Sequence, residues 1–78
     1  MKNSKLKPCR LSASVANLLG LPAAALTPGA QLLISDTEHL WFDSVAGVAI
    51  WQREGLQQGF PADSLEEALA RVRCDNVG

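Results

Sequence analysis

The sequence predicts a small α+β domain, and three observations carry this prediction. An apolar stripe ends at Gly20, two β-type runs flank Ser35–Glu38, and a helix-capping signal begins at Ser64. The expected order is a short N-terminal helix, a β-hairpin over about 31–42, a buried central helix over about 44–54 and a C-terminal amphipathic helix over about 64–74. Because 78 residues hold only one core, we expect a basic arm over 1–10 and a single domain over 11–78.

The N-terminal helix is predicted from the spacing of its apolar residues. Leu11, Val15, Leu18 and Leu19 recur at i, i+4, i+7 and i+8, which places them on one helical face. A serine at position 12 or 14 can accept a hydrogen bond from the first free amides. Gly20 suits a left-handed C-terminal cap, so the helix is expected to end there.

The hairpin is predicted from two short apolar runs that follow a Pro28–Gly29 turn. The runs cover 31–35 and 39–42, and alternate residues in each share a face. Leu33 and Trp41 point away from their apolar neighbours, so both faces of the hairpin carry apolar side chains. Such a sheet is either covered on two sides or packed against a second chain.

A buried helix over 44–54 is predicted from an apolar surface that continues around the helix axis. Asp43 or Ser44 can cap its first turn, and Gly55 can end it. A helix that is apolar on every side is normally buried on every side. A domain of this size has little surface with which to cover it.

The C-terminal helix has the clearest sequence signature. Ser64 and Glu67 have the S-x-x-E spacing of a capping box. Leu65, Leu69 and Val72 follow at i, i+4 and i+7, which gives an apolar stripe facing the rest of the domain.

The charge distribution is asymmetric, although the net charge is only −1. Lys2, Lys5, Lys7 and Arg10 give the first ten residues a charge of +4, and the remaining three arginines and eight acids give −5. Such an arm can bind an acidic partner or a nucleic-acid backbone, fold against the acidic body, or stay solvated.

Cofactor and metal sites are not expected. Cys9 and Cys74 are the two cysteines and His39 is the one histidine, which is too few ligands for a structural zinc site. The cysteines either form a disulfide or stay reduced, and reduced thiols indicate a cytoplasmic protein. No apolar run reaches the ~20 residues that span a bilayer, and no phosphate-binding glycine motif is present.

Catalysis is not expected either, although the residue types for it exist. His39, Asp43 and Ser44 could supply a base, a carboxylate and a nucleophile, but the last two are better explained as helix caps. Glu66 and Glu67 lie in a first helical turn, where negative charge is favourable. We expect a protein that is not an enzyme.

Two layouts point toward DNA binding. Residues 14–22 resemble the first helix and turn of a helix-turn-helix unit, but 23–27 lack side chains that read base edges. Leu19-Gly20-Leu21, Pro28-Gly29 and the hairpin resemble the AbrB/MazE-like swapped-hairpin regulators over roughly 5–43. That resemblance implies an intertwined DNA-binding dimer. In this sequence the first strand of the swapped-hairpin layout is reduced to an arm that Pro8 interrupts.

The favoured function is a non-catalytic protein-interaction module that self-associates as a homodimer or acts in a complex. Adaptor, antitoxin-like and phage-type inhibitor roles fit equally, and a small DNA-binding regulator is the alternative. Large apolar side chains are the expected partner contacts, because such residues dominate interface energetics. They are Trp41, Ile50, Trp51, Leu33 and Phe60. Lys2, Lys5, Lys7 and Arg10 are the expected contacts to nucleic acid or an acidic partner.

Overall fold

A computed structural model describes residues 6–77 of the chain, with side chains described through residue 73. Its five strands form one antiparallel sheet in the order β1-β2-β3-β4-β5, so each strand pairs with its neighbour in sequence. The strands are β1 (Lys7–Cys9), β2 (Ala30–Ile34), β3 (Glu38–Asp43), β4 (Val48–Arg53) and β5 (Leu56–Pro61). The remaining elements are α1 (Ala13–Leu19), the 3₁₀ turn η1 (Ala23–Ala25) and α2 (Leu65–Val77).

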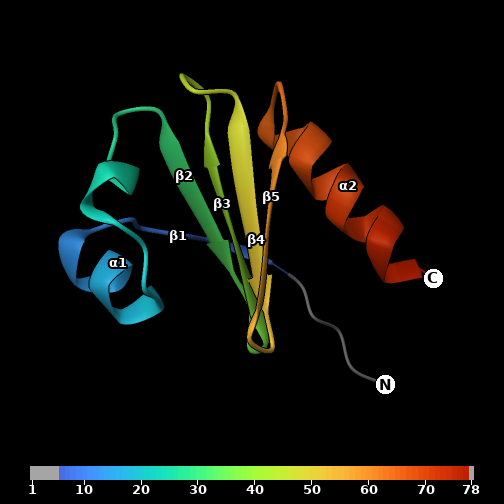
Figure 1. Ribbon diagram of the computed structural model, residues 1–78, viewed down its shortest axis with the longest axis horizontal. Helices are drawn as coiled ribbons and strands as arrows, with labels where there is room; N and C mark the ends of the chain where they lie inside the picture. Colours follow the sequence, from blue (N-terminus) through green and yellow to red (C-terminus); the bar gives the residue numbers. More distant parts are fainter. Residues whose placement is uncertain (1–5, 78) are drawn as a thin grey trace.

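The sheet is the middle layer of three (Figure 1). α1 and η1 lie against one face, and α2 lies against the other. Residues on opposite faces therefore enter separate cores. Ala16, Leu21, Ala25, Leu32 and Trp41 are buried on the α1 side. Leu33, Leu40, Phe42, Ala49, Trp51, Phe60, Ala62, Ala68 and Val72 are buried on the α2 side.

The predicted layout is wrong at its centre, because residues 48–53 form strand β4 and not a helix. Ala49 and Trp51 face α2, whereas Val48 and Ile50 face the α1 side. A strand covered on both faces reads as a continuous apolar run, and such a run matches a helix that is apolar on every side. The apolar residues on both faces of β2 and β3 are likewise covered within this chain.

Two turns place β4 in the sheet. Gly47 has φ of 69° in the turn before β4, a conformation that L side chains rarely adopt. After β4, Glu54 and Gly55 have φ of 48° and 81°, so both central residues of the hairpin turn are left-handed. This combination defines a type I′ turn, which joins adjacent antiparallel strands. Gly55 is thus a hairpin residue and not the end of a helix, and residues 57–59 lie in β5.

The short helix α1 is capped at both ends by side-chain and backbone hydrogen bonds. Ser12 Oγ accepts from the Val15 N–H at 3.3 Å. Gly20 adopts the left-handed conformation with φ of 79°, and its N–H donates to the carbonyls of Ala16 and Asn17. These contacts end the helix within two turns and direct the chain into η1.

The capping box at the start of α2 is confirmed. Ser64 Oγ accepts from the Glu67 N–H at 3.1 Å, and Glu67 Oε1 accepts from the Asp63 N–H at 2.9 Å. These reciprocal bonds satisfy amides that the helix cannot pair itself.

Candidate functional site

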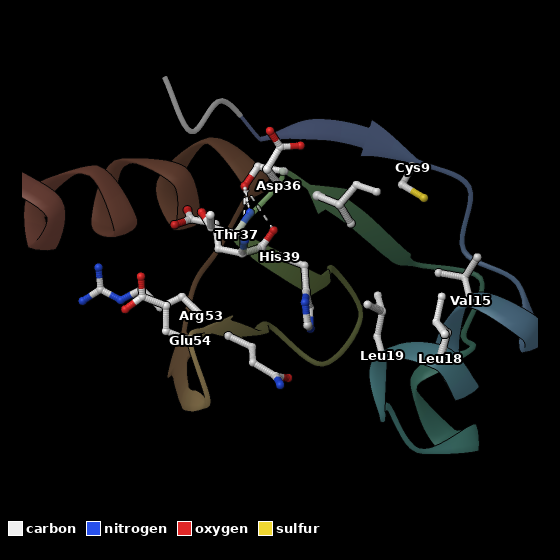
Figure 2. Close-up of a pocket in the computed structure, with 13 residues that line it drawn as sticks. Cys9, Val15, Leu18, Leu19, Asp36, Thr37, His39, Arg53 and Glu54 are labelled. Atoms are coloured by element: carbon white, nitrogen blue, oxygen red, sulfur yellow. Dashed lines mark hydrogen bonds between the residues drawn. The ribbon is translucent and has the colours of Figure 1, made fainter. Parts of the chain in front are cut away.

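A pocket of about 370 Å³ opens on the α1 face of the sheet, at the end where the β2–β3 and β4–β5 turns lie (Figure 2). We call it the His39 pocket. One side is apolar and comes mainly from α1, and the other is polar and comes from the two turns. Its lining residues are Cys9, Val15, Leu18, Leu19, Ile34, Ser35, Asp36, Thr37, Glu38, His39, Gln52, Arg53 and Glu54.

His39 lies in this pocket with one ring nitrogen unsatisfied. Its side chain is 8% exposed, and Nε2 is buried without a hydrogen-bond partner in the described part of the chain. Burial lowers the pKa of His39 below its ordinary value, and a hydrogen bond with the Gln52 side chain opposes this by raising it. Figure 2 shows the ring pointing from β3 toward Leu19 of α1. Burial therefore favours the neutral form of the imidazole.

The charges around the His39 pocket are mainly negative. Asp36 and Glu54 lie at its rim, whereas Glu38 and Arg53 follow the strand alternation of Leu40 and Trp51 and direct their side chains to the α2 face. The Arg53 guanidinium lies over the Trp51 ring, 4.2 Å from its centroid, and Trp51 belongs to the α2-side core. The pocket thus has two acids at its polar rim and aliphatic side chains of α1 on its other side.

The three residues with catalytic potential do not converge. His39 and Asp43 are four residues apart on β3, which corresponds to roughly 13 Å along a strand. Ser44 follows Asp43 in the turn at that far end. Asp43 is already engaged there, since it accepts from the Val45 N–H at 2.9 Å and from the Thr27 hydroxyl at 3.0 Å. Burial raises the pKa of Asp43, but bonds from Val45, Thr27 and the Ala46 N–H lower it below its ordinary value overall.

Most of the expected interface anchors lie in the two cores. Trp41, Trp51, Leu33 and Phe60 are 6%, 2%, 5% and 5% exposed, so none presents a surface in this fold. Ile50 is half-buried on the α1 face. These side chains hold the three layers together, and a partner that contacted Trp41, Trp51 or Leu33 would have to displace a helix.

The expected basic contacts are only partly described. Lys7 in β1 and Arg10 after it are exposed, whereas Lys2 and Lys5 lie outside the described residues. The possible helix-turn-helix is not formed in 6–77, because α1 is followed by the single 3₁₀ turn η1 and then by β2.

Within the described residues, no three His, Cys, Asp or Glu side chains cluster closely enough to hold a metal ion. Cys9 carries a free thiol on the α1 side of the sheet, and α2, which includes Cys74, lies on the other side. In the same part of the chain, no helix has the length and apolarity needed to cross a membrane.

The outer edge of β5 is open for further pairing. The Ala62 N–H donates to the Gly47 carbonyl at 3.0 Å, in register with the β4–β5 ladder. Along an antiparallel strand, the backbone N–H and C=O groups of successive residues point alternately to one neighbouring strand and away from it. Because Ala62 bonds toward β4, the even-numbered residues of β5 direct their backbone groups to β4. The N–H groups of Gln57 and Gly59 therefore point outward. β5 contains no charged residue, and only Phe60 in it is buried.

The opposite edge of the sheet is closed by a proline. The Ser35 N–H donates to the Glu38 carbonyl, so odd-numbered residues of β2 pair with β3 and even-numbered residues with β1. Pro8 lies opposite Leu33, whose backbone groups bond to β3. The backbone groups of Pro8 therefore point outward, away from β2. Proline has no N–H to donate, and it is typical of edge strands that do not pair further. Of the two described edges, β5 alone offers donors.

Sequence reasoning missed both the His39 pocket and the β5 edge. The signal for β5 is the Glu54-Gly55 pair between two strand-length runs, which is a two-residue hairpin pattern. No comparable signal exists for the pocket, because His39 is buried by α1, a helix that is distant in sequence.

Comparisons with known proteins give no further assignment. No protein-family model matches the chain, no curated protein matches it, and no solved structure matches it.

Proposed function

We propose that the protein is a non-catalytic interaction module that self-associates by pairing β5 with β5 of a second copy. The supporting observation is the difference between the two edges of the sheet. β5 presents the outward N–H groups of Gln57 and Gly59, carries no charge and has its outward proline, Pro61, only at its end, whereas Pro8 is the central residue of β1. Proteins normally protect a long edge with charges, prolines or bulges, and an unprotected edge is suited to pairing with another strand.

The edge is self-complementary under two-fold symmetry. When Gln58 of each copy lies at the axis, Gln57 of one copy faces Gly59 of the other. Both residues point outward, so each such pair forms two backbone hydrogen bonds, and the symmetry gives two pairs. No like charges meet, because β5 has none.

The same register brings apolar side chains together. Leu56 is 65% exposed, although it is a large aliphatic residue at the start of β5. In the dimer it lies directly opposite Phe60 of the second copy, on the α2 face of both sheets. Cross-strand aliphatic–aromatic pairs stabilise antiparallel sheets, so Leu56 gains a contact that it lacks in the monomer.

The interface extends beyond the strands to α2. The Arg71 guanidinium lies 5.3 Å from the centroid of the Phe60 ring, which places α2 beside the edge strand. A two-fold axis perpendicular to the sheet keeps both α2 helices on one face. Contacts near the axis therefore come from the strand edge and from the helices above it, which enlarges an interface that two short strands alone would leave small.

The test is the mass in solution, measured by sedimentation equilibrium over a range of concentrations. We expect the wild type to approach twice 8.3 kDa. Gln58→Lys places two cations opposite each other at the axis and should give a monomer, and Gln58→Glu should do the same. Mixing the two variants should restore a dimer, because opposite charges then meet.

Gln31→Lys is the matched control. Gln31 is exposed on β2, on the same face as Gln58 but away from the β5 edge, so this variant should stay dimeric. Gly59→Pro removes an outward N–H without touching the β4–β5 ladder and should also give a monomer. A monomeric wild type, or dimers of Gln58→Lys and Gln31→Lys with equal affinity, would overturn the proposal.

The proposal includes the cellular compartment of the protein. We infer a cytoplasmic location from the free, half-buried thiol of Cys9, because thiols persist in reducing compartments.

A further inference from the structure

We propose that residues 1–5 of the N-terminal arm close over the His39 pocket of their own chain as a strap, with Lys2 and Lys5 contacting the two acids at the pocket rim. The inference is independent of self-association, since it concerns the α1 face of a single chain. Three features carry it: the point at which the arm enters the sheet, the two exposed acids at that end, and the uncovered aliphatic side chains beside them.

The arm enters the sheet at the end where the His39 pocket opens. Lys7 begins β1 and lies opposite Ile34 of β2, which lines the pocket. Continuing this register by two residues places Lys5 beside Asp36 at the rim. Three strand spacings separate β1 from β4, which is about 14 Å, whereas five extended residues span about 17 Å. The arm is therefore long enough to cross the pocket from Asp36 to Glu54.

Charge selects the α1 face of the sheet for the arm, since residues 1–5 contain two lysines and no acid. At this end of the α1 face, the exposed charges are two acids, Asp36 and Glu54, against one cation, Lys7. On the α2 face at the same end, the acid Glu38 is 8% exposed and is matched by the cation Arg53. The α1 face therefore attracts lysines more strongly than the α2 face does.

Lysine also suits the aliphatic side of the pocket. Val15, Leu18 and Leu19 of α1 line that side, and Leu18 is 84% exposed. A lysine side chain lays its methylene stem along apolar surface and keeps its ammonium group in water or beside an acid. Figure 2 shows Leu18 and Leu19 on one side of the pocket and Glu54 on the other. An arm above the pocket thus covers the leucines with lysine stems and brings the ammonium groups to the acids.

Tethering favours the arm over a separate molecule as the occupant of the pocket. A segment joined directly to β1 stays at an effective concentration on the order of millimolar, so contacts that are weak singly are enough to hold it. An acidic partner that binds Lys2 and Lys5 would draw the strap away and uncover Leu18. The strap therefore couples the charge of the arm to the accessibility of the pocket.

The test is paramagnetic relaxation enhancement in the full chain with a nitroxide at position 3. Asn3→Cys, combined with Cys9→Ser and Cys74→Ser, leaves one site for the label. We expect the label to broaden the backbone signals of 17–19 and 52–54 more than those of 69–73. The last segment is a fair reference, because Leu6 and Leu69 pack against the same core. Equal broadening on both faces, or stronger broadening of 69–73, would overturn the proposal.

Two double variants separate charge attraction from simple proximity. Asp36→Asn with Glu54→Gln removes both rim acids. It should lower the ratio of docked to undocked arm about 2- to 30-fold and weaken the broadening of 17–19 accordingly. Asp63→Asn with Glu66→Gln is the matched control, because it makes the same charge change at exposed residues beside the start of α2. Equal effects of the two double variants, or no effect of the first, would overturn the proposal.

A mixed sample distinguishes the chain's own arm from the arm of a second copy. Nitroxide-bearing chains without isotope label are mixed with isotope-labelled chains that carry no nitroxide, so only contacts between copies broaden the observed signals. We expect no broadening of 17–19, and broadening as strong as within one chain would overturn the proposal. With the native cysteines retained, Lys2→Gln with Lys5→Gln should shift the backbone signals of 17–19. Unshifted signals would overturn the proposal even when Cys9→Ser does not fold.

Discussion

Trp41 Nε1 donates a hydrogen bond to the carbonyl oxygen of Ala25 at 3.1 Å, in a fully buried position. This bond joins the central strand β3 to η1 and so holds the α1–η1 segment on its face of the sheet. Trp51, on the other face, has no such bond, and its Nε1 is buried without a partner within the described residues. The two indoles are thus both buried and differ in hydrogen bonding.

This difference predicts unequal effects of the same substitution. Trp41→Phe leaves the Ala25 carbonyl unpaired in the core, whereas Trp51→Phe removes a donor that was already unpaired. We expect Trp41→Phe to lower the free energy of unfolding by about 1–3 kcal/mol more than Trp51→Phe. Urea unfolding of both variants measures the difference. Equal losses would contradict the role assigned to the Trp41–Ala25 bond.

Two glycines of the β4–β5 hairpin, Gly55 and Gly59, are expected to differ in how much stability is lost when each is replaced by alanine. Gly55 has φ of 81°, so Gly55→Ala forces an L side chain into the left-handed region and should cost about 1–2 kcal/mol. A Cβ at Gly59 meets the Ala49 carbonyl oxygen at 3.8 Å, an ordinary contact, so Gly59→Ala should cost far less. Thermal unfolding compares the two. A larger loss for Gly59→Ala would show that the turn geometry described here is wrong.

His39 predicts a pH dependence of stability. Burial lowers its pKa below 6.5 in the folded chain, so between the two pKa values the unfolded chain binds more protons. The stability that neutral His39 contributes is fully present above pH 6.5. It is lost as the pH falls through the lowered pKa of His39 in the folded chain. Unfolding free energies at pH values above and below 6.5 test this, and His39→Phe should remove the slope in this range. An unchanged slope in His39→Phe would assign the dependence to other groups.

The N-terminal cap of α1 gives a fourth prediction. Ser12 Oγ accepts the Val15 N–H, so Ser12→Ala should destabilise the protein by about 1 kcal/mol. Ser14 is exposed one residue inside the helix and provides the control, because alanine there slightly favours the helix. Chemical denaturation of both variants is sufficient. Similar losses for the two serines would refute the cap assignment.

The caps of α1 and α2 could be predicted because their signals are local, whereas Asp43, Ser44 and Gly55, expected as caps of a central helix, lie in turns beside β4. Ser64 and Glu67 satisfy amides within one turn, and Gly20 ends α1 with its own φ. The identity of β4 could not be predicted from its own residues. Its side chains are apolar on both faces because α1 and α2 cover both faces, and that coverage depends on elements outside residues 44–54.

The candidate sites depend on the same long-range arrangement. The sequence predicts Trp41, Trp51 and Phe60 at an interface because one hairpin and one buried helix offer no cover for them. A five-stranded sheet between two helical layers provides that cover. The exposed edge is then β5, in which Gln57, Gln58 and Gly59 lack the apolar alternation that indicates a strand.

The strand order also affects how the chain folds. β2, β3, β4 and β5 are joined by short turns, so their pairing requires only local loop closure. β1 instead pairs with β2 across the segment 10–29, which contains α1 and η1. Long-range pairings form more slowly than local ones because more chain entropy is lost before contacts compensate. We therefore expect the β2–β5 meander to form first, and the N-terminal strand to complete the sheet and its second core last.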